Sequence, residues 1–237
     1  MAVRVNIFII LILTLFANCE DWLIDPTQYK AKFHIHDDKS WSISNGLVQR
    51  DFVTEPNFGT IDFYSLEADN SLLRALSPES ELVFYIDDDV VPVTVGGFTA
   101  SVPRGYLNRT DLRLDKLSGN VFVYKDHNVS RISSDIVWSP MRGAPESSVW
   151  PPAGLHLDVR MKIDNNDVDV GDQLSDVEVH VHYEMYDGVP VISKWVSVSC
   201  SQQCDGLRVK MVSVDQLAVN LEWGPRHFGG DDWLQVS

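Results

Sequence analysis

The sequence predicts an all-β protein, a large two-sheet antiparallel β-sandwich of the supersandwich type. The first observation is a hydrophobic period of two. In "DVEVHVHYEMY" (176–186) and "LHLDVRMKI" (155–163) every second residue is apolar. Such alternation indicates strands with one buried face and one wetter face, as in antiparallel sheets. The second observation is that Gly, Pro, Asn and Asp turns separate many strand-like segments, which is typical of a sandwich.

The remaining elements are assigned in order along the chain. The segments with strand-like patterns are 81–86, 90–95, 120–125, 135–138 and 207–214. Asp187 and Gly188 predict a two-residue hairpin turn, because both tolerate positive φ. Pro190 then predicts a strand start or an edge position. "SLEADNSLLRAL" (65–76) is the one segment for which we expect a short helix.

Residues 1–19 have the pattern of a cleaved signal peptide. Arg4 precedes an aliphatic run from Ile7 to Ala17 that is too short to span a bilayer, and Cys19 offers a small residue for cleavage. We therefore expect a secreted, extracellular protein with one β-sandwich domain over residues 20–237 and no membrane contact after signal cleavage. An uncleaved anchor is the alternative.

Covalent modification fits the same compartment. "NRT" at Asn108 and "NVS" at Asn128 are glycosylation sequons in polar, loop-like contexts. Signal cleavage leaves Cys200 and Cys204, in "CSQQC", which predict a disulfide that closes a small loop. Two reduced thiols are the alternative.

The formal charge of −15 argues against nucleic acid and anionic membranes as partners. It is compatible with a polar neutral ligand, a cation or a basic protein. Nucleophile-elbow, dinucleotide-binding, P-loop and zinc-protease motifs are all absent, so no catalytic residue and no cofactor is predicted.

Two patterns have some metal-binding character. His180 and His182 lie two apart on one strand and face the same way, and "HIHDD" (34–38) repeats this spacing. "DNNDVDVGD" (164–172) offers oxygen ligands but lacks the EF-hand spacing. In each case polar residues on a solvated face are the preferred interpretation, so no metal site is predicted.

Two segments, 139–154 and 223–237, have the composition of site-forming loops. Flat aromatic rings stack on the apolar faces of sugars, while charged and polar groups bond the hydroxyls. The residues we expect at a saccharide-binding site are Trp138, Arg142, Trp150, Trp223, His227, Asp231, Asp232 and Trp233. Trp195 shares a strand face with Val191 and Ser193, and we expect it in the core.

Five stretches resemble the N-terminal β-domain of alpha-galactosidase-like glycoside hydrolases. They are "WSISNGLVQRDF", "PNFGTIDFYS", "SLLRALSPES", "WPPAGLHLDVRM" and "VHYEMYDGVPVISKWVSV". The resemblance implies a galactose mutarotase-like supersandwich that precedes a barrel domain with catalytic aspartates. No position here matches a catalytic residue of that family. Together with the abrupt ending of the chain, it implies a sandwich truncated before a following catalytic domain, which would be its partner.

These observations favour a non-catalytic, carbohydrate-associated sandwich, either a glycosidase N-terminal domain or its stand-alone binding relative, with a saccharide as ligand. Two alternatives remain. One is a mutarotase-like enzyme that transfers protons through a histidine (His156, His180 or His182) and Glu184. The other is an extracellular structural or adhesion module.

Overall fold

The computed structural model of the 237-residue chain describes residues 22–37, 39–86, 89–98, 102–103, 119–134, 136–143, 148–164, 174–201, 204, 206–219 and 234–236. These residues form sixteen β-strands. None of the described residues forms a helix long and apolar enough to cross a membrane. The predicted all-β class is confirmed.

The strands form three sheets, and neighbours in each order are hydrogen-bonded. The first has the order β1 (Lys32–Asp37), β2 (Ser40–Ser44), β3 (Val48–Val53), β4 (Gly59–Ser65), β5 (Asn70–Ser71). The second has the order β13 (Ile192–Cys200), β12 (Val177–Tyr186), β11 (Gly154–Ile163), β10 (Val121–Arg131), β8 (Asp89–Val95), β7 (Ser80–Ile86), β14 (Arg208–Ser213). The third has the order β16 (Leu234–Val236), β15 (Asp215–Val219), β6 (Leu73–Leu76), β9 (Val102–Pro103).

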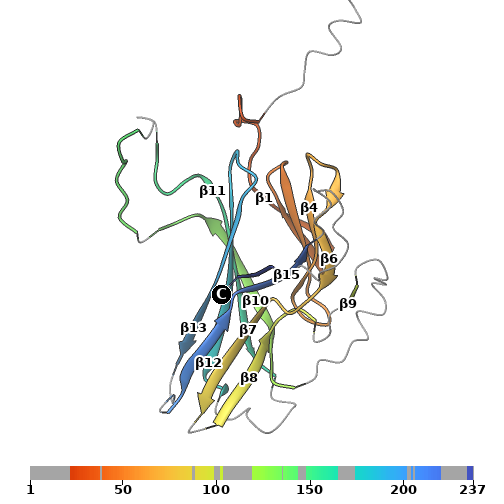
Figure 1. Ribbon diagram of the computed structural model, residues 1–237, viewed down its shortest axis with the longest axis vertical. Coiled ribbons are helices and arrows are strands. Elements are labelled where there is room, and N and C mark those ends of the chain that lie inside the picture. The colour runs from red at the N-terminus through yellow and green to blue at the C-terminus, as the bar shows by residue number, and fades with distance from the viewer. Residues whose placement is uncertain are drawn as a thin grey trace, which may run out of the picture.

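The orange strands of the five-stranded sheet pack against the long seven-stranded sheet (Figure 1). Pairing is antiparallel with one exception, the parallel contact of β8 with β10, where Val121 lies opposite Thr94. This short contact joins the β7–β8 hairpin to the meander of β10, β11, β12 and β13, so that both belong to one sheet.

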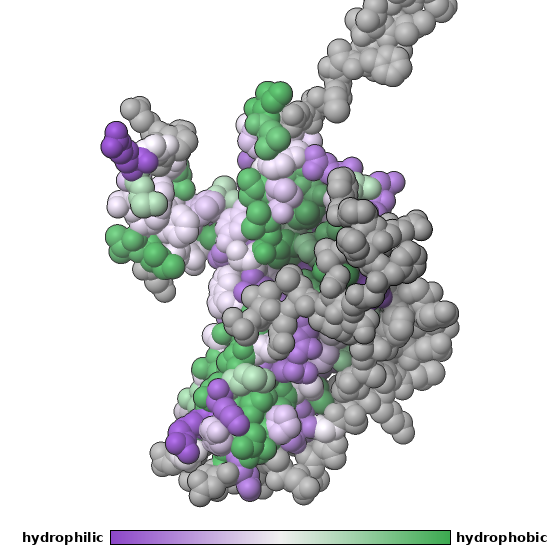
Figure 2. All heavy atoms as spheres, viewed as in Figure 1, coloured by the Kyte–Doolittle hydropathy of each residue, from purple (hydrophilic) through white to green (hydrophobic). Residues whose placement is uncertain are grey.

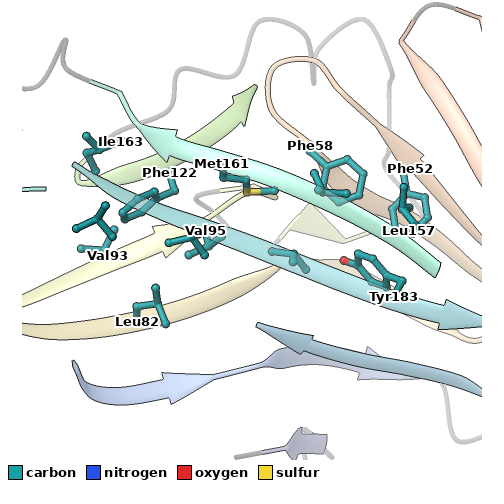
Figure 3. Packing of buried hydrophobic residues seen from close by; sticks show 14 of the residues in the cluster. Phe52, Phe58, Leu82, Val93, Val95, Phe122, Leu157, Met161, Ile163 and Tyr183 are labelled. Atoms are coloured by element: carbon teal, nitrogen blue, oxygen red, sulfur yellow. The ribbon is translucent and has the colours of Figure 1, made fainter. Parts of the chain in front are cut away.

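The core lies between these two sheets. Alternate residues are buried along all of β11 and β12, as the period of two predicts. Leu157 and Tyr183 from the long sheet meet Phe52 and Phe58 from the five-stranded side (Figure 3). The Phe52 and Phe58 rings stack with centroids 5.0 Å apart. The contact that crosses between the sheets is that of Phe52 with Tyr183, whose ring centroids lie 5.1 Å apart. Truncating a buried Phe of this kind costs about 3–5 kcal/mol.

The helix predicted for residues 65–76 is wrong. The segment contains the end of β4, a turn, and strands β5 and β6. Asp69 adopts a φ of 50°, which a helix does not allow, and the Leu72 amide donates to the carbonyl of Phe63 across the turn (2.7 Å). Pairing with β15 and β9 then provides hydrogen-bond partners for the backbone of β6, so tertiary contacts override the local helical pattern.

Two further local predictions are wrong. Residues 136–138 form no strand. The preceding strand, β10, ends at Arg131, and the next strand begins at Gly154. The hairpin of β12 and β13 has a connection spanning residues 187–191, not a two-residue turn. Long-range bonds explain the wider loop: the Asn45 Nδ2 donates to the Tyr186 and Val189 carbonyls, at 2.8 and 2.7 Å.

Candidate functional site

The outer face of β11, β12 and β13 carries a block of polar and aromatic side chains. Register places His156 opposite Glu184 and Asp158 opposite His182, and places Trp195 opposite His182 from the other side. These are the unburied positions of the alternating strands, so the same periodicity that builds the core exposes this block.

Trp195 lies on this outer face, so the expectation that it is a core residue is wrong. Its side chain is 36% exposed. The ring stacks on His182, with centroids 4.9 Å apart and 13° between the planes, and on His156 at 5.3 Å and 20°. Its neighbour Lys194 points inward instead, since successive side chains of a strand alternate.

An open cavity of about 480 Å³ adjoins this block. We call it the aromatic groove. Two tryptophans, Trp150 and Trp195, contribute to its lining together with Tyr186, Glu184 and Ser193. Residues of the segment that follows β10, among them Ile132, Ser134 and Ile136, also line it. The groove thus joins a loop to the edge of the sheet.

The polar groups of the groove are linked. The Tyr186 hydroxyl donates to Glu184 Oε2 (3.0 Å) and lies 2.9 Å from the Ser193 hydroxyl oxygen. Burial raises the pKa of Tyr186, a hydrogen bond with Ser193 lowers it, and Glu184 raises it further. The phenol therefore keeps its proton near neutral pH and remains a donor.

The segment between β10 and β11 supplies Trp150. The Trp150 indole N–H donates to the carbonyl of Ile136 (3.0 Å), and the Trp138 ring lies 5.8 Å away at 34°. This segment projects away from the sheets (Figure 1). Figure 2 shows hydrophobic side chains gathered on it. The exposed apolar residues there are Ile136, Val137, Met141 and Val149.

The structure brings together only part of the predicted saccharide site. Trp138 and Trp150 lie side by side, and Trp150 lines the groove. Arg142 is exposed in a turn and does not line the groove. The other predicted residues lie outside the described part of the chain; they are Trp223, His227, Asp231, Asp232 and Trp233.

The predicted modification sites have different positions. Asn108 lies outside the described residues. Asn128 is exposed, but it lies within β10 opposite Asp158, not in a loop as expected. Cys200, the last residue of β13, is bonded to Cys204, with Cα atoms 6.4 Å apart, a separation that a disulfide spans.

A buried charge cluster supports β13 from the opposite face. Lys194 Nζ donates to Glu79 Oε2 (3.1 Å) and to Asp215 Oδ1 (2.9 Å), and Arg50 forms ion pairs with the same two carboxylates. Tyr183 donates its hydroxyl to Glu79. Two cations are thus paired with two carboxylates on the face of β13 opposite to the one that carries Trp195.

The pKa values of this cluster follow from that pairing. Burial alone would raise the pKa of Glu79, but the charges of Lys194 and Arg50 outweigh it and lower this pKa. The pKa of Asp215 is likewise lowered against the effect of burial, by Arg50 and then Lys194. Both carboxylates are therefore charged at neutral pH.

Sequence reasoning missed two polar groove residues, Tyr186 and Ser193, and considered Glu184 only as a candidate for proton transfer. The alternation of β12 already placed Glu184 and Tyr186 on the solvated face, but the sequence of the strand itself does not indicate which loop packs beside them. No protein-family model matches the chain, and no curated protein or solved structure matches it significantly.

Proposed function

We propose that this chain is a carbohydrate-binding β-sandwich of a secreted protein and that it binds a saccharide in the aromatic groove. The observation that carries the proposal is the pairing of Trp150 and Trp195 in one groove beside linked polar groups. Tryptophan faces stack on the apolar faces of sugar rings, and the polar groups then bond the hydroxyls.

The size and chemistry of the groove support this class of ligand. Its volume of about 480 Å³ lies within the range of roughly 300–1,000 Å³ that small-molecule sites occupy. The Glu184 carboxylate accepts hydrogen bonds, the Ser193 hydroxyl can donate or accept, and the Tyr186 oxygen can accept while its proton is donated to Glu184, which matches the mixed hydrogen bonding of a sugar hydroxyl. Neutral polar ligands also suit a chain with a formal charge of −15.

The resemblance to glycosidase N-terminal domains supports the same class and leaves two forms of it. In one the sandwich is the N-terminal domain of a longer glycosidase; in the other it acts alone. The intact mass of the native secreted protein, after glycan removal, distinguishes them. A mass larger by a barrel domain identifies the first form, and a mass near that of the mature chain identifies the second.

A second candidate function is interconversion of sugar anomers by proton transfer. It is favoured by His156 and His182, which are hydrogen-bonded to each other (3.1 Å) and stack on Trp195, beside the groove carboxylate Glu184. A histidine and a carboxylate at one ligand site are the groups that general acid–base catalysis uses. Purified protein that leaves the mutarotation rate of aldoses unchanged eliminates this candidate.

Binding is tested by screening the full chain on a broad glycan array and measuring the best ligand by calorimetry. Trp150→Ala and Trp195→Ala each remove a stacking ring worth about 0.5–1.5 kcal/mol beyond its buried area. We expect each substitution to weaken binding by roughly three- to tenfold or more.

Trp22→Ala is the matched control, because Trp22 donates to Glu67 and does not line the groove. It should leave the affinity unchanged. An array without a hit, or an affinity that neither groove substitution changes, would overturn the proposal.

A further inference from the structure

Next to the groove, three nitrogen- and oxygen-bearing side chains converge on one point of the outer face. Asp158 Oδ1 lies 2.8 Å from His180 Nδ1 and 3.6 Å from His182 Nδ1. The ligand atoms of these three residues all lie within 4.8 Å of one another. This is the one group of three such side chains found in the part of the chain that the structure describes.

The strands hold these atoms together by register. His180 and His182 lie two residues apart on β12, so both rings project from the same face. Asp158 stands directly opposite His182 on β11 and reaches both rings. The chain separation between Asp158 and the histidines explains why the sequence pattern alone did not predict a metal site.

We propose that Asp158, His180 and His182 bind a divalent transition-metal ion of the zinc class. Metal–ligand bonds of 2.0–2.2 Å at tetrahedral angles separate ligand atoms by about 3.4 Å. The separations of Asp158 Oδ1 from the two imidazole nitrogens, 2.8 and 3.6 Å, bracket that value, so small side-chain rotations bring these atoms to metal-binding distance. Imidazole nitrogens with one carboxylate select zinc, nickel, copper or cobalt over calcium and magnesium.

The outer nitrogen of His182 has a hydrogen-bond partner of the kind that orients metal ligands, and the outer nitrogen of His180 lies near a carboxylate. His182 Nε2 lies 2.8 Å from the Ser197 hydroxyl oxygen, and His180 Nε2 lies 3.9 Å from Glu178 Oε2. A ligating imidazole usually donates its other N–H to such a group, which fixes the ring orientation. A further nitrogen, His156 Nε2, lies 3.1 Å from His182 Nδ1 and offers a fourth ligand.

The burial of the cluster is also suitable. None of the three residues is fully exposed, so the cluster differs from scattered surface carboxylates.

The test uses the full chain without a histidine tag, treated with chelator and dialysed. Zinc titration followed by calorimetry should give one ion per chain, and cobalt should give the strong visible absorption of a four-coordinate site. His180→Ala, His182→Ala and Asp158→Asn should each weaken zinc binding by at least about tenfold. Zinc should raise the thermal midpoint of the native chain but not of these variants.

The other histidine pair supplies the control. His34 and His36 lie two apart on β1 with the same strand spacing, but the structure places no third ligand of this kind beside them among the described residues. The double substitution H34A/H36A should leave zinc binding unchanged. Circular dichroism of every variant shows whether the fold is retained.

Three results overturn the inference: no saturable zinc binding up to millimolar concentration, binding that survives both His180→Ala and His182→Ala, or binding lost in H34A/H36A. The outcome is separable from that of the saccharide proposal. Trp150→Ala removes a groove residue that is not part of the cluster, so it should leave zinc binding intact.

Discussion

His182 and Trp195 stand directly opposite each other on β12 and β13, and their rings stack with centroids 4.9 Å apart. This contact joins two features of the outer face. Trp195 lines the aromatic groove, whereas His182 belongs to the cluster with Asp158 and His180. A substitution of either residue is therefore expected to affect both the groove and the cluster.

The first prediction concerns the protonation of His182. Burial, in which the Trp195 ring takes part, lowers its pKa; Asp158 raises it, and His156 and His180 lower it. Trp195→Ala exposes the imidazole to water, so the His182 pKa should rise toward the ordinary value of 6.5. NMR titration of the ring protons measures it, and an unchanged or lower pKa in the variant contradicts the assignment to burial.

The second prediction follows from the sign of that shift. Because the folded pKa of His182 lies below its unfolded value, the unfolded chain takes up the proton first as the pH falls. The contribution of His182 to the free energy of unfolding is thus complete above pH 6.5 and decreases as the pH falls through that value. His182→Gln should flatten the dependence of the free energy of unfolding on pH between 7 and 5. Urea denaturation at several pH values provides the comparison with the native chain.

The third prediction concerns the buried charge cluster. Lys194→Met leaves Glu79 and Asp215 with Arg50 as their remaining cation, in a site where Glu79 is only 1% exposed. Removing one member of a buried ion cluster costs about 3–5 kcal/mol of unfolding free energy. Lys162→Met, which breaks a surface pair with Glu178, should cost about 1 kcal/mol or less. Equal losses in the two variants, measured by urea unfolding, would disprove the distinction.

The same cluster predicts acid sensitivity, the fourth prediction. The pKa values of Glu79 and Asp215 are lowered on folding, from 4.5 and 3.8 in the unfolded chain. Their stabilising contribution is present above those values and is lost as the pH falls below them toward the lower folded pKa values. Asp215→Asn removes one titrating group, so its unfolding free energy should fall less steeply with pH between 5 and 3. A slope as steep as that of the native chain would argue against this role.

The fifth prediction concerns a close backbone approach at Gly97. This residue has a φ of +66°, and an added Cβ would meet the Ser77 carbonyl oxygen and, at 2.5 Å, the Cα of Pro78. Gly119 has a similar φ of +79°, but no atom of the described residues lies within 4 Å of an added Cβ there. Gly119→Ala should cost about 1–2 kcal/mol from the backbone conformation alone, and Gly97→Ala clearly more. Thermal unfolding of both variants tests this, and equal midpoints would show that crowding is unimportant.

Much of the fold was predictable because the period of two is a local property. The alternation along 155–163 and 177–186 placed Leu157 and Tyr183 inside and His156 and His182 outside, and the structure agrees. The wrong predictions concern segments whose conformation depends on contacts with residues far away in the chain. Asn45 widens the turn after β12, and pairing with β15 makes a strand of residues that look helical.

For the candidate site, the sequence by itself determined which side chains could share a face, including the His180–His182 pair, and it marked Trp138 and Trp150 as loop aromatics. Only the tertiary structure decided that Asp158 stands opposite His182, that Trp195 faces outward, and that the Trp150 loop meets the end of β12. The physical reason is that side-chain alternation follows from the geometry of a single strand. Register and loop approach, in contrast, are fixed by hydrogen bonds and burial between residues far apart in the chain.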